Sequence, residues 1–410
     1  MFAFFSGYLF WYPVIMSLFW ITGSLLFYFR RERKEPLPLK ESPLVSILVP
    51  CYNEEETVRE TIAHLLNLNY PNYEIIMIND GSTDGTAVVA KELALKHKNV
   101  RFIDLQKNSG KANALYLGLL ASRGEFLVCI DSDALLDKNA LLYMIPHFTT
   151  EHNGERVGAV TGNPRVRNRS SLLARMQLVE YASIIGSIKR TQRVLGKIMT
   201  VSGVIVAFRK KALMDVGLWD RDMITEDIAV TWKLQKRFWD VRYEPNAICW
   251  MLVPETIRGI WNQRVRWAQG GVEVLLRHWD IFLDWRQRRL YLIYVEQLCS
   301  ILWSVLWVIF TFLVLFNTAV TANIFNLFTL FSCILSVICI LQFFISIALD
   351  SKYDKEMKKY YFWAAWYPVL YWYMNTLVVV RAIPKAIFRK KGTFAIWESP
   401  DRGVKGNMGA

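Results

Sequence analysis

Charged residues are absent from three long stretches of this 410-residue sequence: residues 1–29, 297–349 and 361–380 contain no Asp, Glu, Lys or Arg. Each stretch is rich in Phe, Trp, Leu, Ile and Val and is long enough to cross a hydrocarbon core about 30 Å thick. These absences argue against a fully soluble protein. Residues 30–296 carry many charges of both signs, and they are numerous enough for one water-soluble domain with its own core.

Several short motifs are also missing. The six cysteines include no CxxC pair, so neither a disulfide framework nor a zinc site is indicated. No GxGxxG or GxxxxGK[ST] follows a predicted strand, which weakens the interpretation as a dinucleotide-binding protein or a P-loop NTPase. The net charge of +13 does not predict a nucleic-acid partner, because basic runs such as residues 30–34 adjoin the apolar stretches and fit lipid headgroups.

The first apolar stretch lacks a basic leader and a small-residue cleavage site, so we interpret it as a retained anchor. The basic run that follows places the large domain in the cytoplasm. Further segments are predicted at 297–316, 327–349 and about 361–380. Four crossings would put the C-terminus outside, whereas the basic tail favours the inside. The last segment is therefore either a full span or one kinked at Pro368 or re-entrant, and the side of the tail stays open.

The composition thus divides the chain into five predicted parts. They are an N-terminal transmembrane helix, a cytosolic domain, amphipathic interfacial helices, three C-terminal transmembrane segments and a basic tail, at residues 1–29, 30–255, 256–290, 291–382 and 383–410.

Within the large domain, apolar runs typical of buried strands alternate with helical patterns. Strands are predicted at 45–50, 73–79, 101–105 and 125–130, with helices between them at 54–68, 86–96 and 111–121. This alternation predicts a parallel, doubly wound α/β sheet covered by helices.

Carboxylates follow the predicted strands at the edge where ligands bind in such sheets. Asp131 and Asp133 come directly after the strand at 125–130, and alternate side chains of an extended segment share a face. Two carboxylates suit Mg²⁺, which binds carboxylates together with phosphate oxygens and water; a solvated turn is the alternative. Asp80 lies in a run rich in Gly, Ser and Thr, and two interpretations of it stay open: a functional role, or a place in a turn or helix cap.

Two acids, Glu226 and Asp227, lie between apolar residues further along the chain. Capping of the following helix, with Thr225 as the cap, is the plain interpretation. The alternative is a general base whose ionised form is held by backbone donors.

Arg and Trp alternate at helical spacing in the stretch around residues 261–269. This pattern is typical of an interfacial amphipathic helix. The alternative is that Arg266 neutralises a diphosphate leaving group and Trp267 offers a flat face to a sugar ring.

In this order the motifs resemble the processive family-2 glycosyltransferases. Asp80, Asp131-Ser132-Asp133, Thr225-Glu226-Asp227 and Gln263 to Trp267 match the D, DxD, TED and QxxRW motifs of that family. The resemblance covers nearly the whole chain. Further stretches resemble the bacterial synthases of poly-β-1,6-N-acetyl-D-glucosamine: residues 108–113, 158–167, 223–228, 264–271 and 397–403.

The resemblance implies an α/β, GT-A-like doubly wound cytosolic domain embedded in a helical transmembrane bundle of the bacterial inner membrane. It implies an inverting enzyme that polymerises N-acetylglucosamine from UDP-GlcNAc with Mg²⁺ or Mn²⁺ and helps to export the polymer for a biofilm matrix. Hyaluronan, chitin and cellulose synthases share the four motifs and remain alternatives. A non-processive transferase acting on a lipid carrier would have no use for the QxxRW run, and a degenerate scaffold would not keep all four motifs.

The resemblance also implies roles for single residues. The donor nucleotide-sugar would contact Tyr52, Glu54, Asp80, Lys111, Asp131, Gln263 and Arg266. Asp131 and Asp133 would hold the metal, and Asp227, supported by Glu226, would be the base. Thr225 and Trp267 would border the acceptor sugar.

The implied partners are membrane lipids, the growing polymer and a small membrane subunit, through which cyclic di-GMP control could act. Aromatic residues of the apolar stretches either line the export path or, as is usual in membrane helices, face lipid and neighbouring helices. They are Trp303, Trp307, Trp366, Tyr371 and Trp372.

Overall fold

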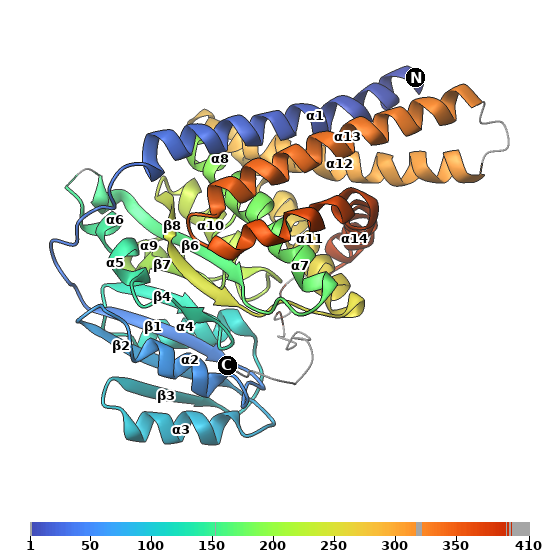
Figure 1. Cartoon of the computed structure of the whole chain (residues 1–410). Coiled ribbons are helices and arrows are strands. Elements are labelled where there is room, and N and C mark those ends of the chain that lie inside the picture. The colour runs from blue at the N-terminus through green and yellow to red at the C-terminus, as the bar shows by residue number, and fades with distance from the viewer. Residues whose placement is uncertain (1, 152, 317–321, 391, 393–394, 396–410) are drawn as a thin grey trace. The chain divides into compact units, whose positions relative to one another are not determined.

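The structure is a computed structural model that describes residues 2–151, 153–316, 322–390, 392 and 395. The chain divides into two compact units, whose elements are labelled in Figure 1. We call Lys34–Asn168, Gly196–Thr256 and Lys390–Ala410 the sheet unit, and Met1–Arg33, Arg169–Leu195 and Ile257–Arg389 the helical unit. The stretch at 397–403 that resembles the synthases, and most of the predicted tail, lie outside the described residues.

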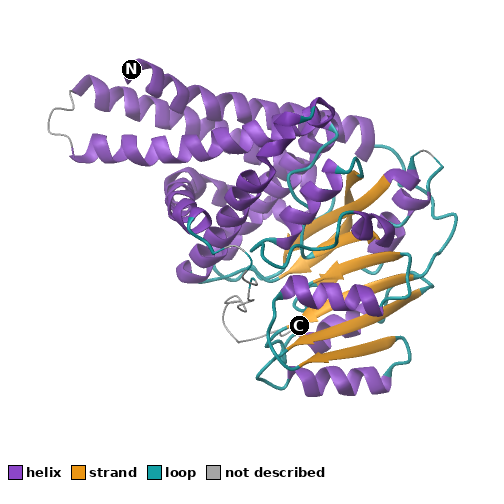
Figure 2. Ribbon diagram, turned by 180° about the vertical axis from the view of Figure 1, so that it is seen from behind, coloured by secondary structure: helices purple, strands orange, loops and turns teal. Residues whose placement is uncertain are grey.

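The sheet unit is built on one eight-stranded sheet, with strand order β3-β2-β1-β4-β7-β6-β8-β5. Figure 2 shows the strands of this sheet in orange. The strands are β1 (Val45–Cys51), β2 (Tyr73–Asp80), β3 (Val100–Leu105), β4 (Phe126–Ile130), β5 (Leu135–Leu136), β6 (Val157–Val166), β7 (Ile205–Arg209) and β8 (Asp240–Met251).

The first four strands confirm the predicted parallel sheet. β1 lies between β2 and β4 and pairs with both in parallel, and β2 pairs in parallel with β3. Every residue of β1 and β4 is buried. This burial explains why both strands are continuous apolar runs rather than alternating patterns.

The second half of the sheet is mixed, which the alternation of the first half did not predict. β7 runs antiparallel to both β4 and β6, and β5 is antiparallel to β8, while β6 and β8 pair in parallel. The antiparallel β7 brings the loop before it to the carboxyl end of β4, because Ile205 pairs with Ile130.

Helices connect the strands and cover the sheet. α4 packs on β1 and β2, and α3 packs on β3. The helices of the sheet unit are α2 (Val58–Leu65), α3 (Thr86–Lys96), α4 (Lys111–Ala121), α5 (Ala140–Met144), α6 (Pro146–Thr149), η2 (Gly154–Arg156), α9 (Lys210–Asp215) and α10 (Glu226–Lys236).

The helical unit contains α1 (Phe2–Phe27), η1 (Tyr28–Glu32), α7 (Leu172–Glu180), η3 (Tyr181–Ser187), α8 (Ile188–Leu195), α11 (Ile257–His278), η4 (Trp279–Leu283), η5 (Trp285–Gln287), α12 (Arg288–Phe316), α13 (Ala322–Asp350), η6 (Lys355–Trp366), η7 (Tyr367–Tyr371) and α14 (Trp372–Ile387). Across both units, η1, η3 and η7 are π-helical, and η2, η4, η5 and η6 are 3₁₀ helices.

Three helical stretches in the described part of the chain are long and apolar enough to cross a membrane: Phe5–Glu32, Trp285–Leu315 and Thr329–Asp350. The predicted fourth segment, about 361–380, is not one continuous helix. It passes from a 3₁₀ helix through the π-helical η7, which holds Pro368 in its first turn, into α14. A proline lacks the N–H that a continuous α-helix would need there.

The apolar core of the helical unit contains two of the aromatic residues proposed for the export path. Trp303 and Trp307 are 8% and 3% exposed, and their rings stack with centroids 5.3 Å apart. The indole N–H of Trp303 donates to the carbonyl of Leu9 at 2.9 Å. These two side chains therefore pack between helices.

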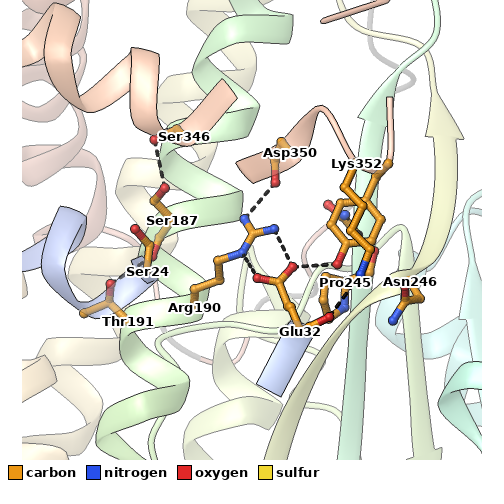
Figure 3. A network of polar contacts seen from close by, with 12 residues as sticks. Ser24, Glu32, Ser187, Arg190, Thr191, Pro245, Asn246, Ser346, Asp350 and Lys352 are labelled. Carbon is orange, nitrogen blue, oxygen red and sulfur yellow. Dashed lines mark hydrogen bonds and ion pairs between the residues drawn. The ribbon is translucent and has the colours of Figure 1, made fainter. Parts of the chain in front are cut away.

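A buried ion-pair network joins three segments of the helical unit (Figure 3). Arg190 of α8 donates from Nε and Nη2 to the two carboxylate oxygens of Glu32, at 2.8 and 2.9 Å. Its Nη1 lies 2.7 Å from Oδ1 of Asp350 at the end of α13. None of the three side chains is more than 2% exposed. We call these three residues the Arg190 network.

Candidate active site

The loops after β1 and β2 are bonded to each other at the carboxyl end of the sheet. The N–H of Asn53 donates to Oγ of Ser82 at 3.0 Å, and the Asn53 side-chain oxygen accepts the N–H of Thr83 at 2.9 Å. Asn53 adopts a left-handed backbone with φ of 55°, a conformation that asparagine tolerates better than most residues. These bonds hold Tyr52 and Glu54, on either side of Asn53, at the predicted site edge.

Glu54 is buried and is hydrogen-bonded on both sides of its loop. Its Oε2 accepts a hydrogen bond from the Thr57 hydroxyl at 2.7 Å, and its N–H donates to Oγ1 of Thr86 at 2.7 Å. Tyr52 is partly exposed.

Asp80 ends β2 and is fully buried. Its carboxylate accepts the backbone N–H of Ser109 at 3.0 Å and that of Gly110 at 2.8 Å. Burial raises the pKa of Asp80, and these two backbone donors oppose the rise. Asp80 therefore fixes the loop that leads into α4. Gly110 has φ of 89° there, a conformation that strongly favours glycine.

The DxD carboxylates lie in a turn. The sequence predicts an extended segment here, with a turn as the alternative. The N–H of Ala134 donates to the carbonyl of Asp131 at 3.1 Å, which closes the turn directly after β4. Burial, followed by the negative charge of Asp131, raises the pKa of Asp133 to about 7. The two carboxylates are thus close enough to repel each other.

Lys111, the first residue of α4, connects the DxD turn to the TED motif. Its Nζ donates to Oδ1 of Asp131 at 2.6 Å and lies 3.3 Å from Oε1 of Glu226. Burial opposes the charged ammonium, but the neighbouring carboxylates of Asp131, Glu226 and Asp227 outweigh it and raise the pKa of Lys111. The site therefore holds a buried cation among several carboxylates.

Asp227 lies in the first turn of α10, facing the loop before β7. Its Oδ2 accepts the N–H of Gly203 at 3.2 Å. The carbonyl of Gly203 in turn accepts from Nζ of Lys111 at 3.3 Å. A Cβ at residue 203 would lie 3.2 Å from the Asp227 carboxylate and 3.3 Å from Lys111 Nζ, so glycine permits this close approach.

Thr225 is the N-cap residue of α10, as expected, but its side chain makes no capping bond. Its hydroxyl is buried and has no hydrogen-bond partner among the described residues. A buried hydroxyl without a partner is unfavourable, which is a feature of sites that receive a polar ligand.

The QxxRW residues belong to the helical unit. Gln263, Arg266 and Trp267 lie in the middle of α11, with Gln263 buried and the other two partly exposed. The side-chain oxygen of Gln263 is buried and finds no partner in the described part of the chain.

The structure thus brings Lys111, Asp131, Glu226 and Asp227 together in the sheet unit, and Asp80 fixes the loop that leads to Lys111. Gly203 is part of this cluster and was missed in the sequence. A glycine between Ser202 and Val204 has no distinctive pattern, because its partners are 24 and 92 residues away along the chain.

A divalent cation fits the donor set of the DxD turn. Among the described residues no group of three or more His, Cys, Asp or Glu side chains could hold a metal by itself. Asp131 and Asp133 offer hard carboxylate oxygens, and burial, followed by repulsion from the charge of Asp131, raises the pKa of Asp133. A hard cation that also binds phosphate oxygens would relieve this repulsion.

Comparison with known structures identifies the class of the fold. A mannosyltransferase from Pyrobaculum calidifontis, solved in complex with GDP-Man and Mn²⁺, superposes with a TM-score of 0.63 at 18% identity and covers 93% of this chain and 99% of its own. The fold is therefore GT-A-like, which confirms the predicted fold class.

Sequence comparison then gives the family. Residues 42–270 match the family described as glycosyltransferase like family 2. The poly-β-1,6-N-acetyl-D-glucosamine synthases of Staphylococcus epidermidis and Staphylococcus aureus strain COL are 47% and 46% identical over 413 and 414 residues, each covering 97% of this chain and 98% of the relative. The chain belongs to glycosyltransferase family 2, as predicted.

Proposed function

We propose that the protein polymerises N-acetylglucosamine from UDP-GlcNAc into a β-1,6-linked chain. One observation carries the proposal: the D, DxD and TED residues and Lys111 converge at the carboxyl edge of a GT-A-like sheet, in a chain that is 47% identical over 97% of its length to a synthase of that polymer.

The donor lies over the strand ends in this proposal. Tyr52, Glu54 and Asp80 border the nucleotide, because the loops after β1 and β2 are fixed to each other there. Asp131 and Asp133 would hold Mg²⁺ or Mn²⁺, which supplies positive charge to the diphosphate as it leaves. Lys111 adds a second fixed positive charge at the same edge.

Asp227 acts as the general base. The 6-hydroxyl oxygen of the acceptor attacks the anomeric carbon, the bond from that carbon to the UDP oxygen breaks, and the electron pair leaves with UDP. The hydroxyl proton passes to the Asp227 carboxylate. The Gly203 N–H donates to that carboxylate and fixes its orientation, and Glu226 pairs with Lys111 rather than with the acceptor.

The QxxRW residues complete the site on the family pattern. Arg266 binds the diphosphate, and Gln263 borders it. Trp267 stacks under the acceptor sugar, and the Thr225 hydroxyl, which has no partner among the described residues, borders the same sugar. Separate residues then serve the leaving group and the nucleophile, as a single displacement requires.

The membrane helices anchor the enzyme and help the polymer to leave. Three helices of spanning length and the basic run at residues 30–34 support a multi-pass inner-membrane protein with a cytoplasmic sheet unit. We extend the proposal to a small membrane subunit as partner, to cyclic di-GMP control through that partner, and to a biofilm matrix as destination of the polymer.

Membrane vesicles containing the protein test this function. Given UDP-GlcNAc and Mg²⁺ or Mn²⁺, and the partner subunit where required, they should form a high-mass polymer that a β-1,6-hexosaminidase degrades. Competing UDP-glucose and UDP-glucuronic acid should not be incorporated, which separates this function from cellulose and hyaluronan synthesis. A product resistant to the hexosaminidase, or a single sugar on a lipid carrier, would refute the proposal.

A further inference from the structure

Arg264, inside the QxxRW run, has no role in the site described so far. It lies on α11 one helical turn before Trp267, so the two side chains share a face of the helix. The guanidinium carbon of Arg264 lies over the indole of Trp267, 4.4 Å from the ring centroid. A cation over an indole face is an attractive contact with a defined geometry.

The guanidinium is itself fixed from the other side. Nη2 of Arg264 donates to Oε2 of Glu180 at 2.6 Å, and the two side chains are 9% and 2% exposed. Burial raises the pKa of Glu180, and the charge of Arg264 opposes the rise. A buried arginine held by a buried carboxylate has little freedom to turn, so it presents one plane to the indole.

The elements that carry these residues are also unusual. Glu180 ends α7, and the π-helical η3 begins at the next residue, Tyr181. The Tyr181 ring lies 6.5 Å from that of Trp267. π-Helical turns within helices are frequently found at functional sites. Trp267 remains partly exposed although the residues that hold it are buried.

We propose that Arg264, anchored by Glu180, is a positioning residue that fixes the indole of Trp267 as the platform for the acceptor sugar. The inference rests on the proposed function, because Trp267 is its acceptor platform. A flat ring can stack under a sugar only when its plane is set in advance, and the entropy of fixing it is then lost on folding rather than on binding.

Arg264→Lys separates positioning from simple charge pairing. Lysine keeps a positive charge for Glu180 but lacks the planar group that stacks on the indole. With a β-1,6-linked N-acetylglucosamine pentamer as acceptor, we expect the acceptor KM to rise roughly three- to tenfold, the size of a lost cation–π contact, and the donor KM to stay unchanged. The products should also become shorter.

Two further variants complete the design. Arg258→Lys, exposed in the first turn of α11, is the matched control and should leave both KM values unchanged. In a Trp267→Ala background, Arg264→Lys should have no further effect, because a residue that acts through Trp267 has nothing left to position.

A double variant keeps the proposal testable if Arg264→Lys fails to fold. Glu180→Gln with Arg264→Gln removes both buried charges and leaves two neutral amides that can bond to each other. The protein should then fold in detergent, and the acceptor KM should still rise. A return of that KM to the wild-type value would show that the pair is structural only, and would overturn the inference.

The inference would also fail if Arg264→Lys raised the donor KM as much as the acceptor KM. It would fail equally if Arg264→Lys raised the acceptor KM of the Trp267→Ala variant by the same factor as that of the wild-type protein. Failure of the proposed function looks different, because the wild-type protein would then form no β-1,6 polymer from UDP-GlcNAc at all.

Discussion

At the scale of single residues, Asp227 is the carboxylate whose position best suits proton transfer. Lys111 pairs directly with Asp131 and Glu226, whereas Asp227 accepts the Gly203 N–H. Asp227→Asn should lower the transfer rate by at least about a hundredfold, since general base catalysis contributes on that order or more. UDP binding should remain nearly unchanged. UDP release during polymerisation and calorimetric titration with UDP measure the two quantities.

Asp215→Asn, at an exposed aspartate that ends α9, is the control for this substitution and should retain the wild-type transfer rate. If Asp227→Asn loses UDP binding together with transfer, Asp227 belongs to the nucleotide site, and the base is another residue.

Residue patterns predicted the carboxylates of the site but not the contacts between them. Asp80 and Asp131 were found because each follows an apolar strand, and parallel strands end at one edge of the sheet. The pairing of Lys111 with Glu226 joins residues 115 positions apart in the numbering of the chain. No local pattern encodes it, because it depends on the antiparallel strand β7 that was not predicted.

At the scale of elements, the Arg190 network should stabilise the packing of α8 against η1 and the end of α13. Arg190→Met removes the guanidinium that compensates the buried charges of Glu32 and Asp350, which costs about 3–5 kcal/mol in comparable networks. We expect the melting temperature of the detergent-solubilised protein to fall by roughly 5 °C or more. Thermal aggregation of the purified protein measures this change.

Arg30→Met is the matched control, because Arg30 is an exposed arginine on the same η1 element as Glu32. It should melt within about 1 °C of the wild-type protein, as surface substitutions usually do. Equal melting temperatures for the Arg190 and Arg30 variants would show that the buried network contributes no net stability.

The element pattern also shows what a local sequence window cannot predict. Helix α8 carries a run of polar residues, Lys189 to Arg193, that a hydrophobic pattern assigns to solvent, yet all five are buried. Arg190 is buried because Glu32 and Asp350 compensate its charge. These two partners come from segments about 160 residues before and after it in the chain. Charge compensation at such distances cannot be read from a local window.

At the scale of the whole molecule, the sheet unit is not one continuous stretch of sequence. Arg169–Leu195 interrupts it and belongs to the helical unit, where α7 packs on η6, η3 on α13 and α8 on α1. A fragment of residues 34–256 would keep this insertion but lose those partners. It would expose apolar side chains of a segment that is buried in the intact chain: Ala174, Met176, Leu178, Val179, Tyr181 and Ala182.

We therefore expect the fragment 34–256 to aggregate or to require detergent, although its composition is that of a soluble domain, because an exposed apolar face of this kind drives association. Size-exclusion chromatography without detergent measures this. Replacing Met176, Leu178 and Val179 with Ser in the fragment should shift the elution towards the monomer. A monodisperse, detergent-free monomer of the unmodified fragment would instead mean that residues 169–195 find sufficient packing without the membrane helices.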